Sequence, residues 1–529
     1  MVLALGFLLL FIIGYLLLDL LTSDLTSEEK MSLSYSMGIG FISFLMFMMF
    51  YFKLLHSKTQ LIILMLLISI VLFTIRHMIK KKAVDNLKHF GSRTIFFKQW
   101  NYKLYLIIFP LFIFSLIFSY YYPIMIFDGI DYEVAGRLMT LSKAVEPENY
   151  FRPYPPLIPV AYSFTYFLGG NHPKIIFSLF YLSLVICFYF RLSAWGLNKS
   201  SSLVFTLILA TTPYTFWHSF LGILDLTAAY YFSIATLFWF SHLRNISESG
   251  DESRINCSHP LLAGIFYSLS IFTRFEMLVY FLIPLIFTAL YSLKYHILKN
   301  VLYLALPSLF ISSFWFFSSY KLVSGEDFKI FSIAIIILII AVVLLYFIIL
   351  KKGYDNIIGF IDRCEMRAFY LVKVIGLSFA IFLIVCVFIP QDMQSNLYFV
   401  NQLTFFIKTL ITRSIAFIFG NIFFLSTSVL IMLFPVIEYK VFRREYIYLF
   451  VFIISFLLFN IIMFSYLYFF DYISDSIARS YDLMKFLNNI VYHPGKVISS
   501  AQIRGLLPIY PVIIFFFAIS RRIQKAFEV

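Results

Sequence analysis

The sequence is poor in charged residues and lacks the motifs of nucleotide-driven chemistry. Asp, Glu, Lys and Arg make up 13% of its 529 residues, whereas soluble domains carry about 25%. No Walker A, glycine-rich dinucleotide or HExxH pattern occurs, and no internal repeat at solenoid periods is present. These absences argue against a soluble domain and against ATP-driven transport by this chain alone.

Cysteine is also scarce. The cysteines show no paired spacing along the chain, at positions Cys187, Cys257, Cys364 and Cys386. Two lie in apolar runs and two in loops expected on the cytoplasmic side, where thiols stay reduced. The sequence therefore indicates neither a disulfide framework nor a zinc site.

Apolar residues dominate the chain. They make up 61% of the sequence, the mean hydropathy is +0.90, and runs such as Ile335–Leu350 carry no charge at all. A helix needs about 20 apolar residues to cross a bilayer, and lipid-embedded backbone must satisfy its own hydrogen bonds. The alternation typical of barrel strands is absent. The pattern predicts an all-α polytopic membrane protein with about 15 spans.

The formal charge of +14 does not indicate nucleic-acid binding, because the basic residues cluster in short loops between spans, as the positive-inside rule requires. Arg76–Lys103 is the most basic loop and holds a single acid, Asp85, so we expect it in the cytoplasm. The next span, Leu104 to about Met125, then places Asp128 on the outer face. Met1 begins an apolar run without a basic n-region, which we interpret as a retained span with its N-terminus outside.

Two apolar stretches are too short to fit as spans. Leu157–Leu168 and Thr404–Phe419 are interpreted as helices lying at the outer interface or dipping partway into it. Residues 1–103 are predicted to be additional N-terminal spans with a basic cytoplasmic loop, and residues 104–529 a transmembrane catalytic module. No soluble domain is expected, and the predicted location is the cytoplasmic membrane with the active site on its extracytoplasmic face.

Ionisable residues gather at the predicted outer ends of the spans. They are Asp128, Asp131, Glu133, Arg137, Arg152, Asp225, Arg274, Glu276 and Arg504. The inner ends show mostly ordinary loop Lys and Arg. Charge at a membrane surface can be functional: a carboxylate serves as general base for a hydroxyl acceptor, and guanidinium groups hold a phosphate leaving group. This distribution predicts sugar transfer from a polyprenyl phosphate that reaches the site through the bilayer.

The stretch FDGIDYEVAGR (127–137) resembles the first outer loop of the GT-C superfamily of polyprenyl-phosphate-sugar-dependent glycosyltransferases, close to its aminoarabinose-transferase and protein O-mannosyltransferase branch. The resemblance covers about Leu104–Ser520. It implies a GT-C-type bundle with outer-face interfacial helices in the first large loop. It also implies that Asp128 is the catalytic base of an inverting displacement and that Tyr132 and Arg137 match later positions of the motif.

Four further segments resemble the same family in order. YPPLIPVAYSFTYFLGG is similar to a segment whose basic residue helps to bind lipid phosphate; here that position is Tyr154, and Arg152 two residues earlier could substitute. The other segments, LDLTAAYYF, FTRFEM and IRGLLPIYP, map Asp225, Arg274 with Glu276, and Arg504. The implied partners are a polyprenyl-phosphate-linked sugar, the bilayer and an acceptor whose class stays open. No cofactor is expected to be required.

Several alternatives stay open from the sequence. Asp131 competes with Asp128 as the base, and Glu133 and Arg137 are four residues apart and can simply pair on a helix. A divalent cation held by Asp131, Glu133 and His172 is a further option. The rival functions are a transporter or flippase of lipid-linked sugars, which would favour ionisable residues at mid-span, and a non-catalytic subunit of an envelope-assembly complex.

Overall fold

The protein is described here from a computed structural model. It describes residues 2–86, 102–124, 127–146, 155–249, 258–274, 276–295, 298–322, 448–457 and 507–520, and the isolated residues 337, 340, 341 and 344. The described residues form helices and no strand. The chain divides into two compact units, residues 1–353 with 518–529, and residues 354–517. The candidate site lies in the first unit.

Five of the described helices are long and apolar enough to cross a membrane. They are α1 (Val2–Leu21), α2 (Ser27–Tyr51), α3 (Lys58–Asn86, of which Lys58–Ile79 is the apolar span), α4 (Tyr102–Tyr121) and α7 (Ile175–Ala194). The prediction of an all-helical membrane protein is confirmed at this level.

The first unit contains eight further described helices. They are α5 (Phe127–Ser142), α6 (Leu157–Phe167), α8 (Lys199–Thr211), α9 (Pro213–His218), α10 (Asp225–Ser249), α11 (Ser258–Thr273), α12 (Met277–Tyr295) and α13 (Leu298–Leu322). In the second unit, an apolar helix at Tyr448–Leu457 lies against α22 (Tyr510–Ala518), where the rings of Phe450 and Phe516 are 6.0 Å apart.

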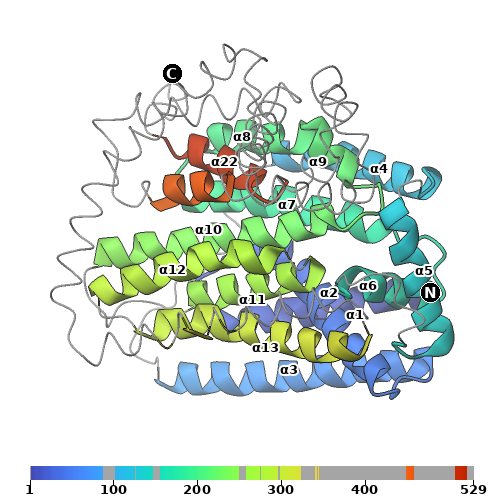
Figure 1. Cartoon of the computed structure of the whole chain (residues 1–529). Helices are drawn as coiled ribbons and strands as arrows, with labels where there is room; N and C mark the ends of the chain where they lie inside the picture. The colour runs from blue at the N-terminus through green and yellow to red at the C-terminus, as the bar shows by residue number, and fades with distance from the viewer. Residues whose placement is uncertain are drawn as a thin grey trace, which may run out of the picture. The chain divides into compact units, whose positions relative to one another are not determined.

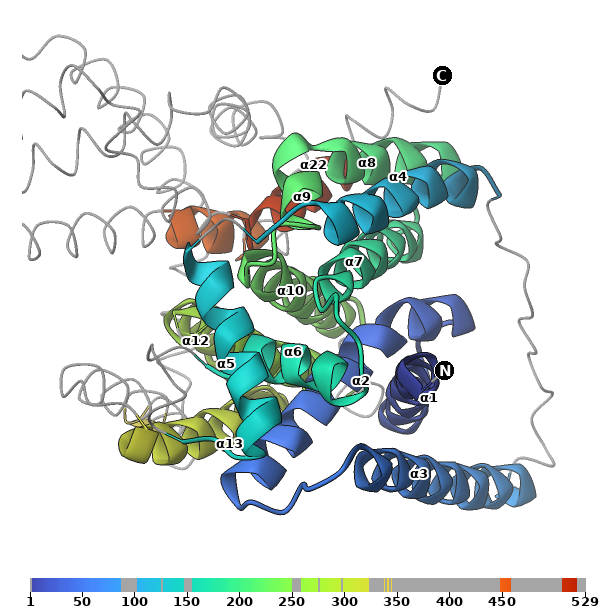
Figure 2. The same ribbon diagram turned by 90° about the vertical axis from the view of Figure 1, so that its right-hand side faces the viewer.

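The long helices of the first unit lie side by side, and α5 crosses one end of them (Figures 1 and 2). We call this end the α5 end. An ion pair of 3.0 Å between Lys53, after α2, and Glu146, after α5, lies there, as does the start of α1, whose Leu3 approaches Gly170. The opposite end is marked by the contact between Ser258, at the start of α11, and Asp24, in the α1–α2 connection. Successive long helices therefore alternate in direction, as the sequence predicts.

Glycine allows α1 and α2 to approach closely. A Cβ atom on Gly14 of α1 would collide with the carbonyl oxygen of Ser34, and one on Gly38 of α2 would collide with the carbonyl oxygen of Leu10. Small residues permit such backbone contact in membrane helices, where packing rather than the hydrophobic effect drives association. The pair α1–α2 is thereby held as one antiparallel hairpin.

Helix α2 lies in the middle of the first unit. The hydroxyl of Tyr35 donates to the carbonyl oxygen of Ile176 in α7 at 3.1 Å, and Ser36 and Tyr230 of α10 are joined by a hydroxyl–hydroxyl bond of 2.6 Å. The first unit thus continues across residue 103 without a break in packing. The functional division predicted at that residue stays a prediction.

Two segments differ from what the sequence predicts. Helix α6 matches the short stretch expected at the interface, but almost all of its residues are buried by neighbouring helices, because its apolar side chains cover all faces. The alternation of basic loops in the sequence also predicts one outward span at Leu203–Phe216, but this segment forms two helices, α8 and α9, which meet at Pro213. Proline disfavours helical backbone in the residue before it and suits the first helical position. Thr404–Phe419 and the spans expected between 323 and 447 lie outside the described residues.

Candidate functional site at the α5 end

Helix α5 carries the acidic residues of the FDGIDYEVAGR motif. Its bounds, Phe127–Ser142, place Asp128 in the first turn, where the partial positive charge of a helix N-terminus favours a carboxylate. Asp131 lies one turn later, on the same face as Asp128. The side chain of Asp128 is outside the described part of the structure. Tyr132, the next position of the motif, is buried.

Glu133 and Arg137 pair with each other. Arg137 donates from Nη2 to Oε1 of Glu133 at 2.7 Å, and the hydroxyl of Tyr166 in α6 donates to the same oxygen at 2.7 Å. The guanidinium also lies 5.0 Å from the centre of the Tyr166 ring. The Arg137 side chain is 59% exposed, so this pair fastens α5 to α6 at the surface. Of the two roles that the sequence left open, pairing is the one observed.

Asp225, Arg274 and Glu276 come together at the ends of α10 and α11. Arg274 donates from Nη1 to Oδ1 of Asp225 at 2.7 Å and from Nε to Oε2 of Glu276 at 3.2 Å. The Asp225 side chain is only 2% exposed, and that of Arg274 is 10% exposed. Two carboxylates thus fix the plane of the guanidinium. The sequence assigned these three residues to one site, although they come from two separate segments, and in the structure they form one ion cluster.

Lys174 is a site residue that sequence reasoning missed. It precedes the first residue of α7 and is 5% exposed. Its ammonium donates to the carbonyl oxygens of Tyr122 and Phe220, the latter at 3.2 Å, and lies 5.7 Å from the Tyr122 ring centre. No carboxylate of the described residues forms an ion pair with it. The only signal in the sequence is a lone lysine directly before an apolar run.

Burial has a clear effect on Lys174. Removal from water lowers the pKa of its ammonium to about 8, and the charge of Glu133 opposes this change only in part. Desolvation disfavours the charged form of lysine. Among the described residues, the partners of this ammonium are carbonyl oxygens and an aromatic ring. Such a buried ammonium is suited to meet an anion that enters from outside the protein.

The first turn of α5 lies next to Lys174. A Cβ atom on Gly129 would be 3.0 Å from the carbonyl oxygen of Gly222, and one on Gly222 would be 3.0 Å from Cδ of Lys174. Gly222 has a φ of +84°, which L-residues rarely adopt, and its carbonyl accepts a hydrogen bond of 2.9 Å from Tyr162 of α6. The turn at Gly222, before α10, therefore lies between the first turn of α5 and Lys174 and is in close contact with both.

The structure does not assemble the optional metal site. Within the described ranges, no group of three or more His, Cys, Asp and Glu side chains is placed to hold an ion. His172 is exposed, and its ring lies 4.1 Å from that of Tyr120, so Asp131, Glu133 and His172 form no common site. Arg152, Tyr154 and Arg504 lie outside the described residues.

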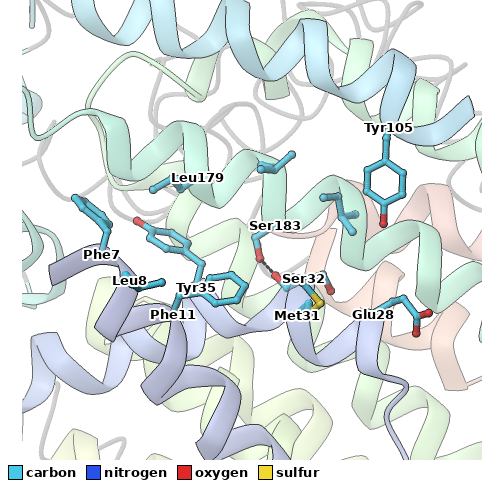
Figure 3. A pocket seen from close by; sticks show the side chains of 12 residues that line it. Phe7, Leu8, Phe11, Glu28, Met31, Ser32, Tyr35, Tyr105, Leu179 and Ser183 are labelled. Atoms are coloured by element: carbon cyan, nitrogen blue, oxygen red, sulfur yellow. Dashed lines mark hydrogen bonds between the residues drawn. The ribbon is translucent and has the colours of Figure 1, made fainter. Parts of the chain in front are cut away.

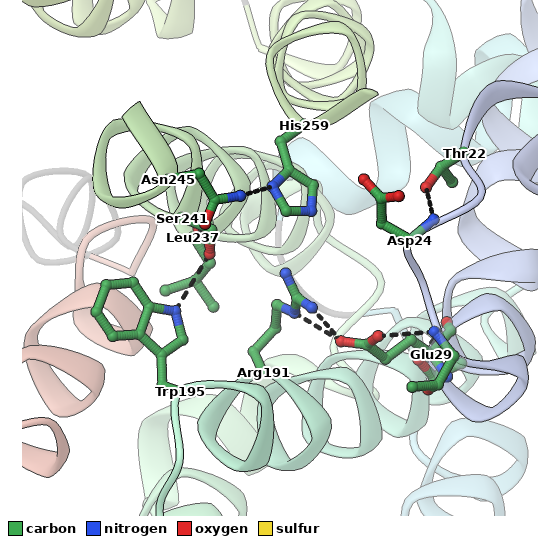
Figure 4. A network of polar contacts seen from close by, with 11 residues as sticks. Thr22, Asp24, Glu29, Arg191, Trp195, Leu237, Ser241, Asn245 and His259 are labelled. Carbon is green, nitrogen blue, oxygen red and sulfur yellow. Dashed lines mark hydrogen bonds and ion pairs between the residues drawn. The ribbon is translucent and has the colours of Figure 1, made fainter. Parts of the chain in front are cut away.

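The opposite end holds a buried polar network, which corrects the expectation of ordinary loop charges there (Figure 4). Arg191 of α7 donates to Oε1 of Glu29 in α2, at 2.8 Å from Nε, and both side chains are at most 5% exposed. Glu29 is held by a capping box with Thr26, and His259 of α11 faces the pair with its ring 3.4 Å from Asn245.

Comparisons with protein-family models, with curated proteins and with solved structures find no match for this chain.

Proposed function

We propose that the chain is an integral-membrane glycosyltransferase. It moves a sugar from a polyprenyl-phosphate donor to an acceptor hydroxyl or amine at the α5 end. The observation that carries the proposal is that the first turn of α5, which bears Asp128, is separated from the buried Lys174 only by the turn at Gly222, at the end of an apolar helix bundle. A donor with a lipid tail and a charged head would enter such a site from the bilayer.

Asp128 takes the acceptor proton in this mechanism. The acceptor oxygen or nitrogen attacks the anomeric carbon, the bond between that carbon and the phosphate oxygen breaks, and polyprenyl phosphate leaves with its electron pair. Configuration at the anomeric carbon is inverted, because attack and departure occur on opposite faces. Lys174 meets the phosphate charge that develops, which supplies the basic contact that Tyr154 cannot provide. The ion cluster of Asp225, Arg274 and Glu276 positions the donor beside Lys174.

The charge distribution favours this function over transport. In the five described spans, the charged residues lie within the first or last turns: Asp19, Glu28, Glu29, Lys30, Lys58, Arg76, Lys103 and Arg191. A transporter of charged substrates needs ionisable residues or broken helices near the midplane. The charged residues of the five described spans are at the span ends instead.

The test is a release assay with purified protein. A panel of polyprenyl-phosphate sugars is incubated with the protein and candidate acceptors, and free polyprenyl phosphate is measured. Asp128→Asn is expected to abolish release, Asp131→Asn to retain it, and Lys174→Gln to raise the donor KM. Glu146→Gln, an exposed acid at the same end, is the matched control. Full activity of Asp128→Asn would refute the base assignment, and donor crossing vesicle membranes without release would favour the flippase.

A further inference from the structure

A furrow runs along the first unit between α1 and α4, with α2 and α7 as its floor. Its cavity volume is about 440 Å³, and its lining comes from all four helices. Most of these side chains are apolar: Phe7, Leu8 and Phe11 of α1, Met31 of α2, and Leu179, Leu182 and Ile186 of α7. Leu8 and Met31 are 56% and 48% exposed, so the furrow is open to the surroundings of the helix bundle.

The surroundings of this furrow are hydrocarbon. Its walls, α1 and α4, are both helices long and apolar enough to span a membrane, and their outward faces carry exposed large apolar side chains: Leu5, Leu8, Ile12, Leu106, Phe109, Ile113, Phe114 and Ile117. An apolar recess on such a face is filled by lipid chains. The lining on α2 and α7 extends over eight residues of each helix, about 10 Å, which fits one chain laid along the bundle.

One end of the furrow is polar. Figure 3 shows Glu28 of α2 and Tyr105 of α4 at one end, and Phe7, Leu8 and Phe11 at the other. Glu28 forms no ion pair among the described residues, whereas the neighbouring Glu29 is bound to Arg191. A carboxylate at the mouth of an apolar recess repels a phosphate and attracts an ammonium group.

The polar end is opposite to the candidate active site. Phe7 reaches the ring of Phe164 in α6, 5.7 Å away, which places the apolar end of the furrow toward α5. Glu28 lies next to Glu29, in the network at the other end of the bundle. A donor lipid with its phosphate at Lys174 would have its head at the wrong end for this furrow. The occupant is therefore a different lipid.

We infer that the furrow binds one glycerophospholipid with an amine headgroup, its acyl chain between α1 and α4 and its ammonium at Glu28. Tyr105 adds a phenol that can donate to the phosphate ester. The bound lipid would stabilise α4 against the α1–α2 hairpin, since no other described helix fills the space between α1 and α4. This site is separate from the proposed glycosyl-transfer site, and only the exclusion of the donor lipid as its occupant rests on that proposed function.

Native mass spectrometry of the full-length protein tests the inference. The protein is delipidated in detergent and titrated with phosphatidylethanolamine, or with phosphatidylglycerol of the same acyl chains. The protein is expected to retain one phosphatidylethanolamine and to bind it about tenfold more tightly than phosphatidylglycerol, a difference that one charge-assisted hydrogen bond can supply. Glu28→Gln is expected to remove the preference, while the control Glu146→Gln keeps it. Equal retention of the two lipids, or a preference that survives Glu28→Gln, would overturn the headgroup assignment.

Filling the furrow tests its location. Leu182→Trp is expected to abolish retention of the lipid, whereas Leu67→Trp, on the exposed apolar face of α3, is expected to leave it unchanged. Ile186→Trp serves in case Leu182→Trp does not fold, with folding checked by gel filtration. Retention that persists in the folded furrow variants would overturn the site. A polyprenyl phosphate that displaces phosphatidylethanolamine from the wild type would overturn the choice of occupant.

Discussion

The ion cluster of Asp225 and Arg274 should contribute far more to stability than the chemically similar pair of Glu133 and Arg137. Arg274→Gln removes the guanidinium that lies 2.7 Å from the carboxylate of Asp225, a side chain that is only 2% exposed. Loss of one partner from a buried pair costs about 3–5 kcal/mol. Since Arg274 is itself 10% exposed, we expect a value near the lower limit, about 3 kcal/mol. Arg137 is 59% exposed, and its helical pair is worth only about 0.3–0.5 kcal/mol.

A double-mutant cycle measures this difference. Asp225→Asn, Arg274→Gln and the double variant are unfolded by titrating SDS into mixed micelles, with tryptophan fluorescence as the readout, and the same cycle is made with Glu133→Gln and Arg137→Gln. The buried cycle should give a coupling energy of about 2 kcal/mol, less than the single-variant cost because Glu276 still contacts position 274. The exposed cycle should give less than about 0.5 kcal/mol. Additive effects at Asp225 and Arg274, or equal coupling in the two cycles, would refute the reasoning.

Three further outcomes follow from the structure. The pKa of Lys174 is lowered to about 8 from an ordinary 10.5, so between these pH values the unfolded chain binds more protons than the folded protein. The free energy of unfolding should therefore rise with pH across that window. Lys174→Met should remove this rise from unfolding curves measured at different pH values. Gly222→Ala forces a φ of +84° on a residue with a Cβ, and should cost about 1–3 kcal/mol in the same assay; a neutral result would contradict the observed turn. Thr26→Ala removes the capping-box acceptor, which lies 3.2 Å from the Glu29 amide nitrogen, and should lower the free energy of unfolding by about 1 kcal/mol. Thr211→Ala is the control and should cost less, because the Thr211 hydroxyl donates to a carbonyl oxygen of its own helix.

Hydropathy and charge in the sequence predicted the all-helical membrane class and the alternating directions of the described helices. They also placed Asp225 and Arg274 at helix ends, because charged side chains are excluded from the apolar runs. These properties depend on residues close together in the chain, so periodicity and composition are sufficient to detect them.

The tertiary structure decided which of these residues meet and which others join them. Glu29 and Arg191 are 162 residues apart, and Lys174 gains its role only because Tyr122 and Phe220 bring carbonyl oxygens around it. Hydropathy says that a helix is buried but not which of its faces meets which neighbour. In α2 apolar and small polar residues cover all sides, so its central position depends on the close approach of Gly14 and Gly38, which only the packed bundle reveals.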